Sequence, residues 1–174
     1  SSRLNSKSQR MHPIIVWLRR DLRIDDNTAL FHASKTGATV VPLFILDSEL
    51  IKRLPSDGAV FDFQAEALRE LQQNIISLGG RLILRHGKVM SVHKQIIQEL
   101  QPSALFFNRD YEPYATERDA KVVKLYQSYG IEIKTYKDTV LQEPDEVLTG
   151  EGKPYVVFTP FANAWKRLPA PTPL

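Results

Sequence analysis

Residues 14–18 read IIVWL, and residues 19–23, which follow them directly, read RRDLR. A continuous apolar run with β-branched members is typical of a strand that is buried on both faces, as the strands of parallel sheets are. The abrupt change to charged residues marks the end of this strand. The two stretches together predict a buried β-strand followed by a polar, arginine-rich turn.

Four more strands are indicated by short apolar runs farther along the chain. They are expected within Thr39–Leu46 and at Arg81–Arg85, Ala104–Asn108 and Ile131–Thr135. Helix-period segments separate these runs, and such alternation is the signature of βαβ units. We therefore expect an α/β fold, a Rossmann-like doubly wound five-stranded parallel sheet with helices on both faces.

Pro42 conflicts with this pattern because it lies inside the second expected strand. Proline has no amide hydrogen to donate to a neighbouring strand, so it usually indicates an edge strand or a bulge. The surrounding residues, TVVPLFIL, are otherwise apolar, as in a buried strand. The sequence alone leaves the position of this strand in the sheet open.

Capping and apolar spacing predict the helices. Asp25 or Asp26 can cap a first helix, which is expected from about Asn27 to Lys35. A loop over Asp47–Gly58 should lead to a long second helix. Its apolar face is expected to carry Phe61, Leu68, Leu71, Ile75 and Leu78, whereas the faces of the two later helices carry Val89, Val92, Ile96 and Leu100, and Ala115, Val122, Leu125 and Tyr129.

The composition describes a protein that can bury an ordinary core. The 174 residues are 43% hydrophobic and include no cysteine, which excludes thiol catalysis and cysteine-ligated metals. No apolar run approaches the ~20 residues that a membrane-spanning helix needs. We therefore expect no membrane partner and a cytoplasmic location.

The net charge of +3 comes from the first ten residues. These hold Arg3, Lys7 and Arg10 and no acid, so the other 164 residues carry 20 basic and 20 acidic side chains. Residues 1–11 are expected to be a disordered tail or a segment introduced by cloning. The charge is therefore no argument that the folded body binds nucleic acid.

Polar stretches follow three of the expected strands. They are residues 19–23, Leu46-Asp47, and residues 108–112, which include Asp110 and Glu112. Ligands of open parallel sheets bind beyond the carboxyl ends of the strands, so these stretches are candidates for a polar rim around a planar or anionic ligand. The alternative is an Arg–Asp network that only fixes the loops.

The sequence lacks the motifs of several common sites. No G-x-G-x-x-G follows the first strand, and there is no phosphate-binding loop or nucleophile elbow. The histidines, His12, His32, His86 and His93, share no spacing typical of metal ligands. We therefore expect no catalytic residues and no metal site in this chain.

Four stretches, in this order, resemble the DNA photolyase and cryptochrome family: VWLRRDLRIDDNTAL (16–30), VVPLFILD (40–47), LFFNRDYEPYATERD (105–119) and GKPYVVFTPFANAWKRLPAPTPL (152–174). The resemblance covers the chain from about residue 12 to its end. It implies a light-dependent flavoprotein whose amino-terminal α/β domain holds a light-harvesting antenna in many members. In such proteins a larger helical domain binds FAD and damaged DNA, and the excited reduced flavin donates an electron to a cyclobutane pyrimidine dimer.

The resemblance also implies a domain plan. Residues 12–136 would form the antenna-binding domain, and residues 137–174 an irregular extension and the start of a linker to an FAD-binding helical domain that this chain lacks. FAD and DNA would be bound only through that domain of the parent chain, a carbon–carbon lyase, and this fragment alone would be inactive. Alternatives are a cryptochrome-type photoreceptor domain, or a stand-alone nucleotide-binding or electron-transfer module.

The residues of the antenna pocket follow from the same resemblance. They are Arg19, Arg20, Asp21, Leu22, Phe44, Ile45, Leu46, Asp110 and Glu112. An arginine that contributes to deazaflavin pockets is replaced here by Val60 or its neighbour Phe61, and the folate-contacting Asn-Glu pair aligns with Tyr114-Ala115. The antenna chromophore is therefore a deazaflavin, a folate or a flavin, or the pocket is empty.

Overall fold

The computed structural model describes residues 12–53 and 59–137, and of residues 59–63 it describes the backbone alone. The elements are β1 (Ile14–Leu18), α1 (Thr28–Ser34), β2 (Val40–Asp47), α2 (Ser48–Ile51), α3 (Ala59–Ser77), β3 (Ile83–Gly87), α4 (Val89–Leu100), β4 (Ala104–Asn108), α5 (Pro113–Ser128) and β5 (Glu132–Tyr136). The expected tail, residues 1–11, and residues 138–174 of the expected extension lie outside the described residues.

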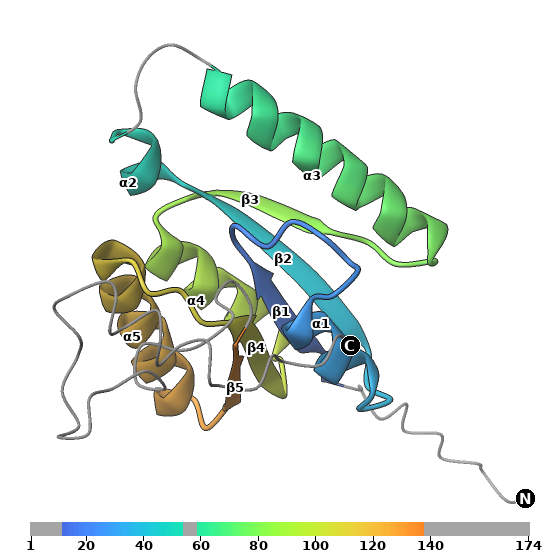
Figure 1. The fold of residues 1–174 in the computed structure, drawn as a ribbon. Helices are drawn as coiled ribbons and strands as arrows, with labels where there is room; N and C mark the ends of the chain where they lie inside the picture. Colours follow the sequence, from blue (N-terminus) through green and yellow to red (C-terminus); the bar gives the residue numbers. More distant parts are fainter. Residues whose placement is uncertain (1–11, 54–58, 138–174) are drawn as a thin grey trace, which may run out of the picture.

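The five strands form one sheet in the order β3-β2-β1-β4-β5. Every neighbouring pair is parallel. The chain builds outward from β1 to β3, returns to β4 on the other side of β1, and then adds β5 (Figure 1). The expected doubly wound five-stranded parallel sheet is confirmed, and its strand order reverses between β1 and β4.

Helices cover both faces of the sheet, as expected (Figure 1). On one face Ala29 and Ala33 of α1 and Leu71 and Ile75 of α3 pack against the even-numbered residues of β1. On the other face α4 and α5 pack against the odd-numbered residues, including Trp17. The interior strands β1, β2 and β4 therefore send alternate side chains into two separate cores, which explains their uninterrupted apolar runs.

The position of Pro42 is resolved by the register of the strands. β2 is an interior strand, but its pairing with β3 begins only at Leu43, whereas Pro42 pairs with Val16 of β1. Ile14 donates to the carbonyl of Thr39, and peptide groups alternate sides along a strand, so the nitrogen of Pro42 points away from β1. The amide hydrogen that proline lacks would point to the β3 side of β2, at a position that precedes the pairing of β2 with β3.

The first helix begins differently from the prediction. Its cap is Asn27, whose side chain accepts from the amide of Leu30, and neither Asp25 nor Asp26 has this role. Asp26 adopts a φ of 53°. This left-handed residue turns the chain so that the next residue, with extended backbone, faces the free amides of the helix.

Two side chains that were expected on apolar helix faces are exposed instead. Leu78 is 73% exposed and Tyr129 is 53% exposed. Both directly follow the last helical residue, Ser77 and Ser128 respectively, so the helical period no longer directs them toward the sheet. The expected loop after β2 also contains α2, and Phe61 lies outside the described side chains.

His93 is a fully buried polar residue in the core between the sheet and α4–α5. Its Nδ1 lies 2.9 Å from the Tyr126 hydroxyl, and its ring packs edge-on against Trp17 at 4.5 Å between centroids. Burial, together with the nearby guanidinium groups of Arg118 and Arg19, lowers the pKa of His93 to about 3. The imidazole is therefore neutral in the folded protein at any pH near neutrality.

This burial should make the protein acid-sensitive. Between pH 6.5 and about 3 the unfolded chain protonates His93 and the folded protein does not, so the free energy of unfolding falls as the pH falls. His93→Phe should flatten this dependence by up to ~1.4 kcal/mol per pH unit. Urea unfolding followed by circular dichroism from pH 3.5 to 7.5 measures the slope.

Tyr126→Phe is the matched control, because it removes the hydroxyl beside Nδ1 and leaves the imidazole buried. It should retain most of the slope of the unsubstituted protein. Parallel pH profiles for His93→Phe and the unsubstituted protein would contradict the explanation.

Candidate functional site

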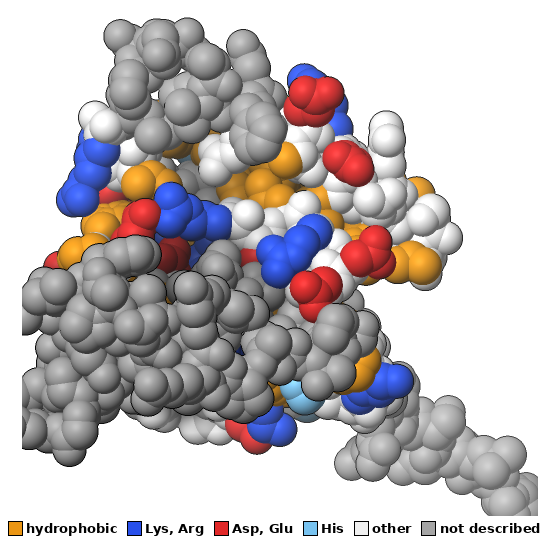
Figure 2. All heavy atoms as spheres, in the orientation of Figure 1, with side chains coloured by type: hydrophobic (Ala, Val, Ile, Leu, Met, Phe, Trp, Pro, Cys, Tyr) orange, Lys and Arg blue, Asp and Glu red, His pale blue; other side chains and the backbone are white. Residues whose placement is uncertain are grey.

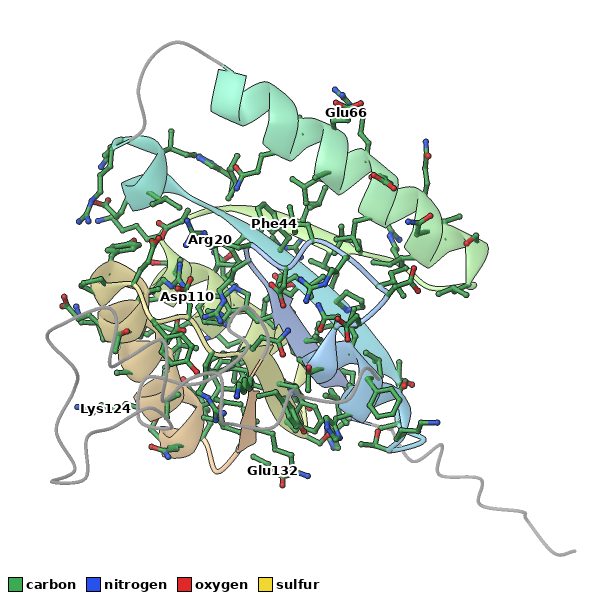
Figure 3. All side chains as sticks on the ribbon, in the orientation of Figure 1. Arg20, Phe44, Glu66, Asp110, Lys124 and Glu132 are labelled. Atoms are coloured by element: carbon green, nitrogen blue, oxygen red, sulfur yellow. The ribbon has the colours of Figure 1, made fainter. Side chains whose placement is uncertain are left out.

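The carboxyl ends of β1, β2 and β4 bring the three polar stretches to one edge of the sheet. Figure 3 shows Arg20, Phe44 and Asp110 at this edge, whereas Glu132 lies at the opposite end of the strands. Strand order reverses between β1 and β4, so the edge contains the position where doubly wound sheets form a ligand crevice. The expected site residues lie at or next to this edge.

Asp21 is a buried carboxylate that joins the ends of β1 and β4 to the start of α1. Its Oδ2 accepts from Asn108 Nδ2 at 2.7 Å and from Asn27 Nδ2 at 3.2 Å, and its Oδ1 accepts from the amide of Arg19 at 2.9 Å. Asn108 Oδ1 in turn accepts from the amide of Ala29 at 3.0 Å. The contacts described for Asp21 are thus structural, as the alternative of a loop-fixing network anticipated.

Arg19 turns its side chain toward α5. Its guanidinium donates to the Asp119 carboxylate and to the carbonyl of Asn108, and it lies over the rings of Trp17 and Phe107 at 4.8 and 4.9 Å. A ligand on the α1–α3 face could therefore reach the backbone of Arg19 but not its guanidinium.

Two residues that the sequence analysis did not select complete this ion-pair network. Arg118 donates to Asp119 at 2.9 Å and lies 5.0 Å from the Trp17 ring, so Trp17 has two guanidinium groups over its indole. Asp119 is buried. The sequence did hold a signal for Arg118 and Asp119, because both lie in the stretch 105–119 that was singled out above. Their contacts show that the helix after β4 contributes side chains to this edge of the sheet.

A tyrosine–carboxylate pair stands at the end of β2. The hydroxyl of Tyr114 donates to Asp47 Oδ2 at 2.6 Å, and Arg53 lies over the Tyr114 ring at 4.4 Å. Burial and the bond to Asp47 raise the pKa of Tyr114 to about 12, so the phenol remains protonated. Asp47 also caps α2 by accepting from the amide of Glu49.

The charged rim consists of Arg20, Asp110 and Glu112. Arg20 pairs with Glu112 at 2.6 Å, and both side chains are about 60% exposed. Asp110 Oδ1 accepts from the amide of Glu112 at 3.2 Å, which fixes the turn that follows β4. Since exposed ion pairs contribute little stability, these groups can change partners at little cost when a ligand arrives.

Strand alternation divides the expected apolar residues between the two faces. Phe44, Leu46 and Leu22 lie on the α1–α3 face, where Leu46 and Leu22 are half-buried and Phe44 is buried. Ile45 belongs to the opposite core and can offer a ligand only its backbone. Figure 2 shows hydrophobic side chains gathered on this face between α3 and the strands. The structure thus brings an apolar floor next to the charged rim.

The described part of the chain holds no group of three His, Cys, Asp or Glu residues that could bind a metal ion. Within the same residues, no helix is long and apolar enough to span a bilayer.

A family model for DNA photolyase matches residues 14–174. Among curated proteins, the deoxyribodipyrimidine photo-lyase of a Synechococcus species is 37% identical over 162 residues. These residues cover 93% of this chain and 34% of that protein, so the chain spans about a third of the length of this relative.

Two solved structures share the fold. The class III photolyase from Agrobacterium tumefaciens has a TM-score of 0.83 at 29% identity, covering 95% of this chain and 34% of that one. The archaeal photolyase from Sulfolobus tokodaii has a TM-score of 0.78 at 29% identity, covering 92% and 36% respectively. It was solved with two FAD molecules, with the implication of a novel light-harvesting cofactor.

The network around Asp21 predicts a large effect of one substitution. Asn108→Ala removes one donor to the buried carboxylate and the acceptor for the Ala29 amide, so we expect a loss of about 3 kcal/mol in the free energy of unfolding. Glu112→Gln, which alters only the exposed pair with Arg20, should change it by less than about 1 kcal/mol. Urea denaturation measures both values, and similar losses would argue against a special role for the network.

Proposed function

The chain belongs to the DNA photolyase family, and from this we propose that residues 12–136 are the light-harvesting domain of a photolyase, which binds an antenna chromophore at the carboxyl edge of its sheet. The observation that carries the proposal is the apolar floor of Leu22 and Leu46 beside the charged rim of Arg20 and Asp110. A flat heteroaromatic chromophore needs this combination, because its ring faces are apolar and its edges carry carbonyl and N–H groups.

Each group of the site has a distinct part in this proposal. Leu22 and Leu46 contact the ring face and exclude water, and both pack against the buried cluster that contains Phe44. Arg20 donates to a ring carbonyl, and the Asp110 carboxylate accepts from a ring N–H. The backbone of Arg19, Asp21 and Ile45 can offer further polar contacts, while Glu112 sets the position of Arg20. When bound, the chromophore would absorb light and pass its excitation energy to the FAD of the parent protein.

A flavin or a deazaflavin fits the site better than a folate. The Tyr114-Ala115 pair stands where folate-type members carry their contacting residues, but the Tyr114 hydroxyl is already bound to Asp47 and Ala115 is buried. The Sulfolobus tokodaii photolyase, with its two FAD molecules, supports a flavin as a light-harvesting group in a relative of this chain.

The function of the whole protein is proposed at the family level. The parent would repair cyclobutane pyrimidine dimers in the cytoplasm, with FAD and DNA held by a helical domain of the same chain. The curated relative named above is a deoxyribodipyrimidine photo-lyase, which favours repair over a cryptochrome-type photoreceptor. A stand-alone nucleotide-binding module would instead bind AMP or ATP saturably, although no phosphate-binding loop supports it.

Chromophore titration tests the proposal. The chain expressed together with flavin or deazaflavin biosynthesis should retain a visible absorption band. FMN, FAD, a deazaflavin and a folate can each be titrated into protein that has been prepared without chromophore. Arg20→Ala and Asp110→Asn should each weaken binding about tenfold, as expected for losing one charge-assisted hydrogen bond. Asp110→Asn keeps an oxygen acceptor for the Glu112 amide and so spares the turn.

Arg85→Ala is the matched control, since Arg85 forms a similarly exposed ion pair with Glu99 but lies on β3. It should leave binding unchanged. If the chain retains none of these compounds and binds none on titration, the antenna proposal falls.

A further inference from the structure

Trp17 lies close to the proposed chromophore site, although it does not belong to it. It directly precedes Leu18, the last residue of β1, and the three residues from Trp17 to Arg20 span at most ~10 Å. The side chain of Trp17 is 1% exposed and packs in the core formed with α4 and α5. The sheet therefore separates the indole from a chromophore on the α1–α3 face, but the distance between them is short.

A tryptophan at such a distance can quench an excited chromophore without touching it. An indole gives up one electron readily, and an excited flavin is a strong oxidant. The electron would pass from the indole to the chromophore, which leaves the indole a radical cation and ends the excited state before its energy is transferred. A light-harvesting site must exclude this competing reaction.

Two positive charges lie over the indole of Trp17. The guanidinium carbons of Arg19 and Arg118 are 4.8 and 5.0 Å from the ring centroid. Their side chains are 9% and 11% exposed, so water and salt screen these charges little. Asp119 accepts from both guanidinium groups, and its single negative charge leaves a net positive charge beside the ring. A radical cation on the indole would be repelled by that charge.

The indole N–H of Trp17 is also unusual. Nε1 has no hydrogen-bond partner among the described residues, whereas a buried tryptophan N–H usually has one. Oxidation of an indole becomes easier when this proton can leave to a base. Here the described fold offers no acceptor, and the burial of the ring keeps solvent away. The unsatisfied N–H, which needs an explanation in a buried place, thus acts in the same direction as the guanidinium groups.

We propose that Arg19 and Arg118 protect the excited chromophore by making Trp17 difficult to oxidise. This role rests on the proposed antenna function and deepens it, because it assigns a part in energy transfer to residues on the opposite face of the sheet. The two guanidinium groups destabilise the indole radical cation and do not touch the chromophore. The cation–π contacts that stabilise the core are the same contacts that prevent the loss of the electron.

The oxidation potential of Trp17 tests the proposal in protein prepared without chromophore. Trp165→Phe leaves Trp17 as the one tryptophan of the chain, so the indole wave in square-wave voltammetry belongs to it. In this background Arg118→Met should make the indole at least tenfold easier to oxidise at equilibrium, a fall of at least ~59 mV in its potential. Arg118→Lys retains a positive charge and should keep most of the potential. An unchanged potential in Arg118→Met would overturn the proposal.

The fluorescence lifetime of bound FMN gives the second measurement. Arg118→Met should shorten this lifetime at least twofold, whereas the same substitution combined with Trp17→Phe should leave it unchanged. Lys134→Met is the matched control, because it removes a cation from over the ring of Phe106, which is not an electron donor. The control should not alter the lifetime.

Two further outcomes of the lifetime measurement are distinguishable. An equal shortening with and without Trp17 would assign the quenching to another ring, such as Tyr114, which lies 5.7 Å from the Arg118 guanidinium, and would overturn the proposal. If the chain binds no chromophore, the antenna function fails and the protective role of Arg118 fails with it, whereas the shift in the potential of Trp17 would still stand.

Discussion

The buried carboxylate of Asp21 is the constraint on which the carboxyl edge of this domain depends. A charge in a buried place must be surrounded by donors, and here they come from the amide of Arg19 and the side chains of Asn27 and Asn108. These donors belong to β1, the start of α1 and the end of β4, so satisfying one carboxylate fixes three elements at the point where strand order reverses. The exposed rim of Arg20 and Glu112 is built on this fixed frame.

The two faces of the sheet have different tasks as a result. Toward α4 and α5 the core is closed, with Trp17 enclosed by His93 and by the guanidinium groups of Arg19 and Arg118. Toward α1 and α3 the packing among the described residues is less complete, and both the apolar floor at the carboxyl edge and a concavity lined by Leu30, Val40 and Ile75 lie on this side. The proposed chromophore contacts thus lie on the more open face, while the closed face supplies stability.

The sequence was sufficient to predict the strands and the sheet, because continuous apolar runs report burial on both faces and the intervening helices require parallel pairing. It could not place Pro42, since the position of a strand depends on pairing between distant residues. The two aspartates before α1 were suitable helix caps by residue type. Because Asp26 adopts a left-handed φ, the residue after it, Asn27, faces the free amides and caps the helix. At the site, the order of the motifs predicted which edge of the sheet carries the polar stretches. It could not predict that the side chains of Arg19 and Asp21 serve the fold, because their partners, Asp119 and Asn108, are distant in the sequence.

Energy transfer from an antenna depends on the distance and orientation between two chromophores, so a light-harvesting domain is useful only if its position relative to the next domain is fixed. A linker that leaves β5 and moves freely would not provide this. Within the domain, the network of Asp21, Asn27 and Asn108 fixes the ends of β1 and β4 against the start of α1. A chromophore bound at this edge would therefore be held in one orientation relative to the sheet, which is the first requirement for efficient transfer.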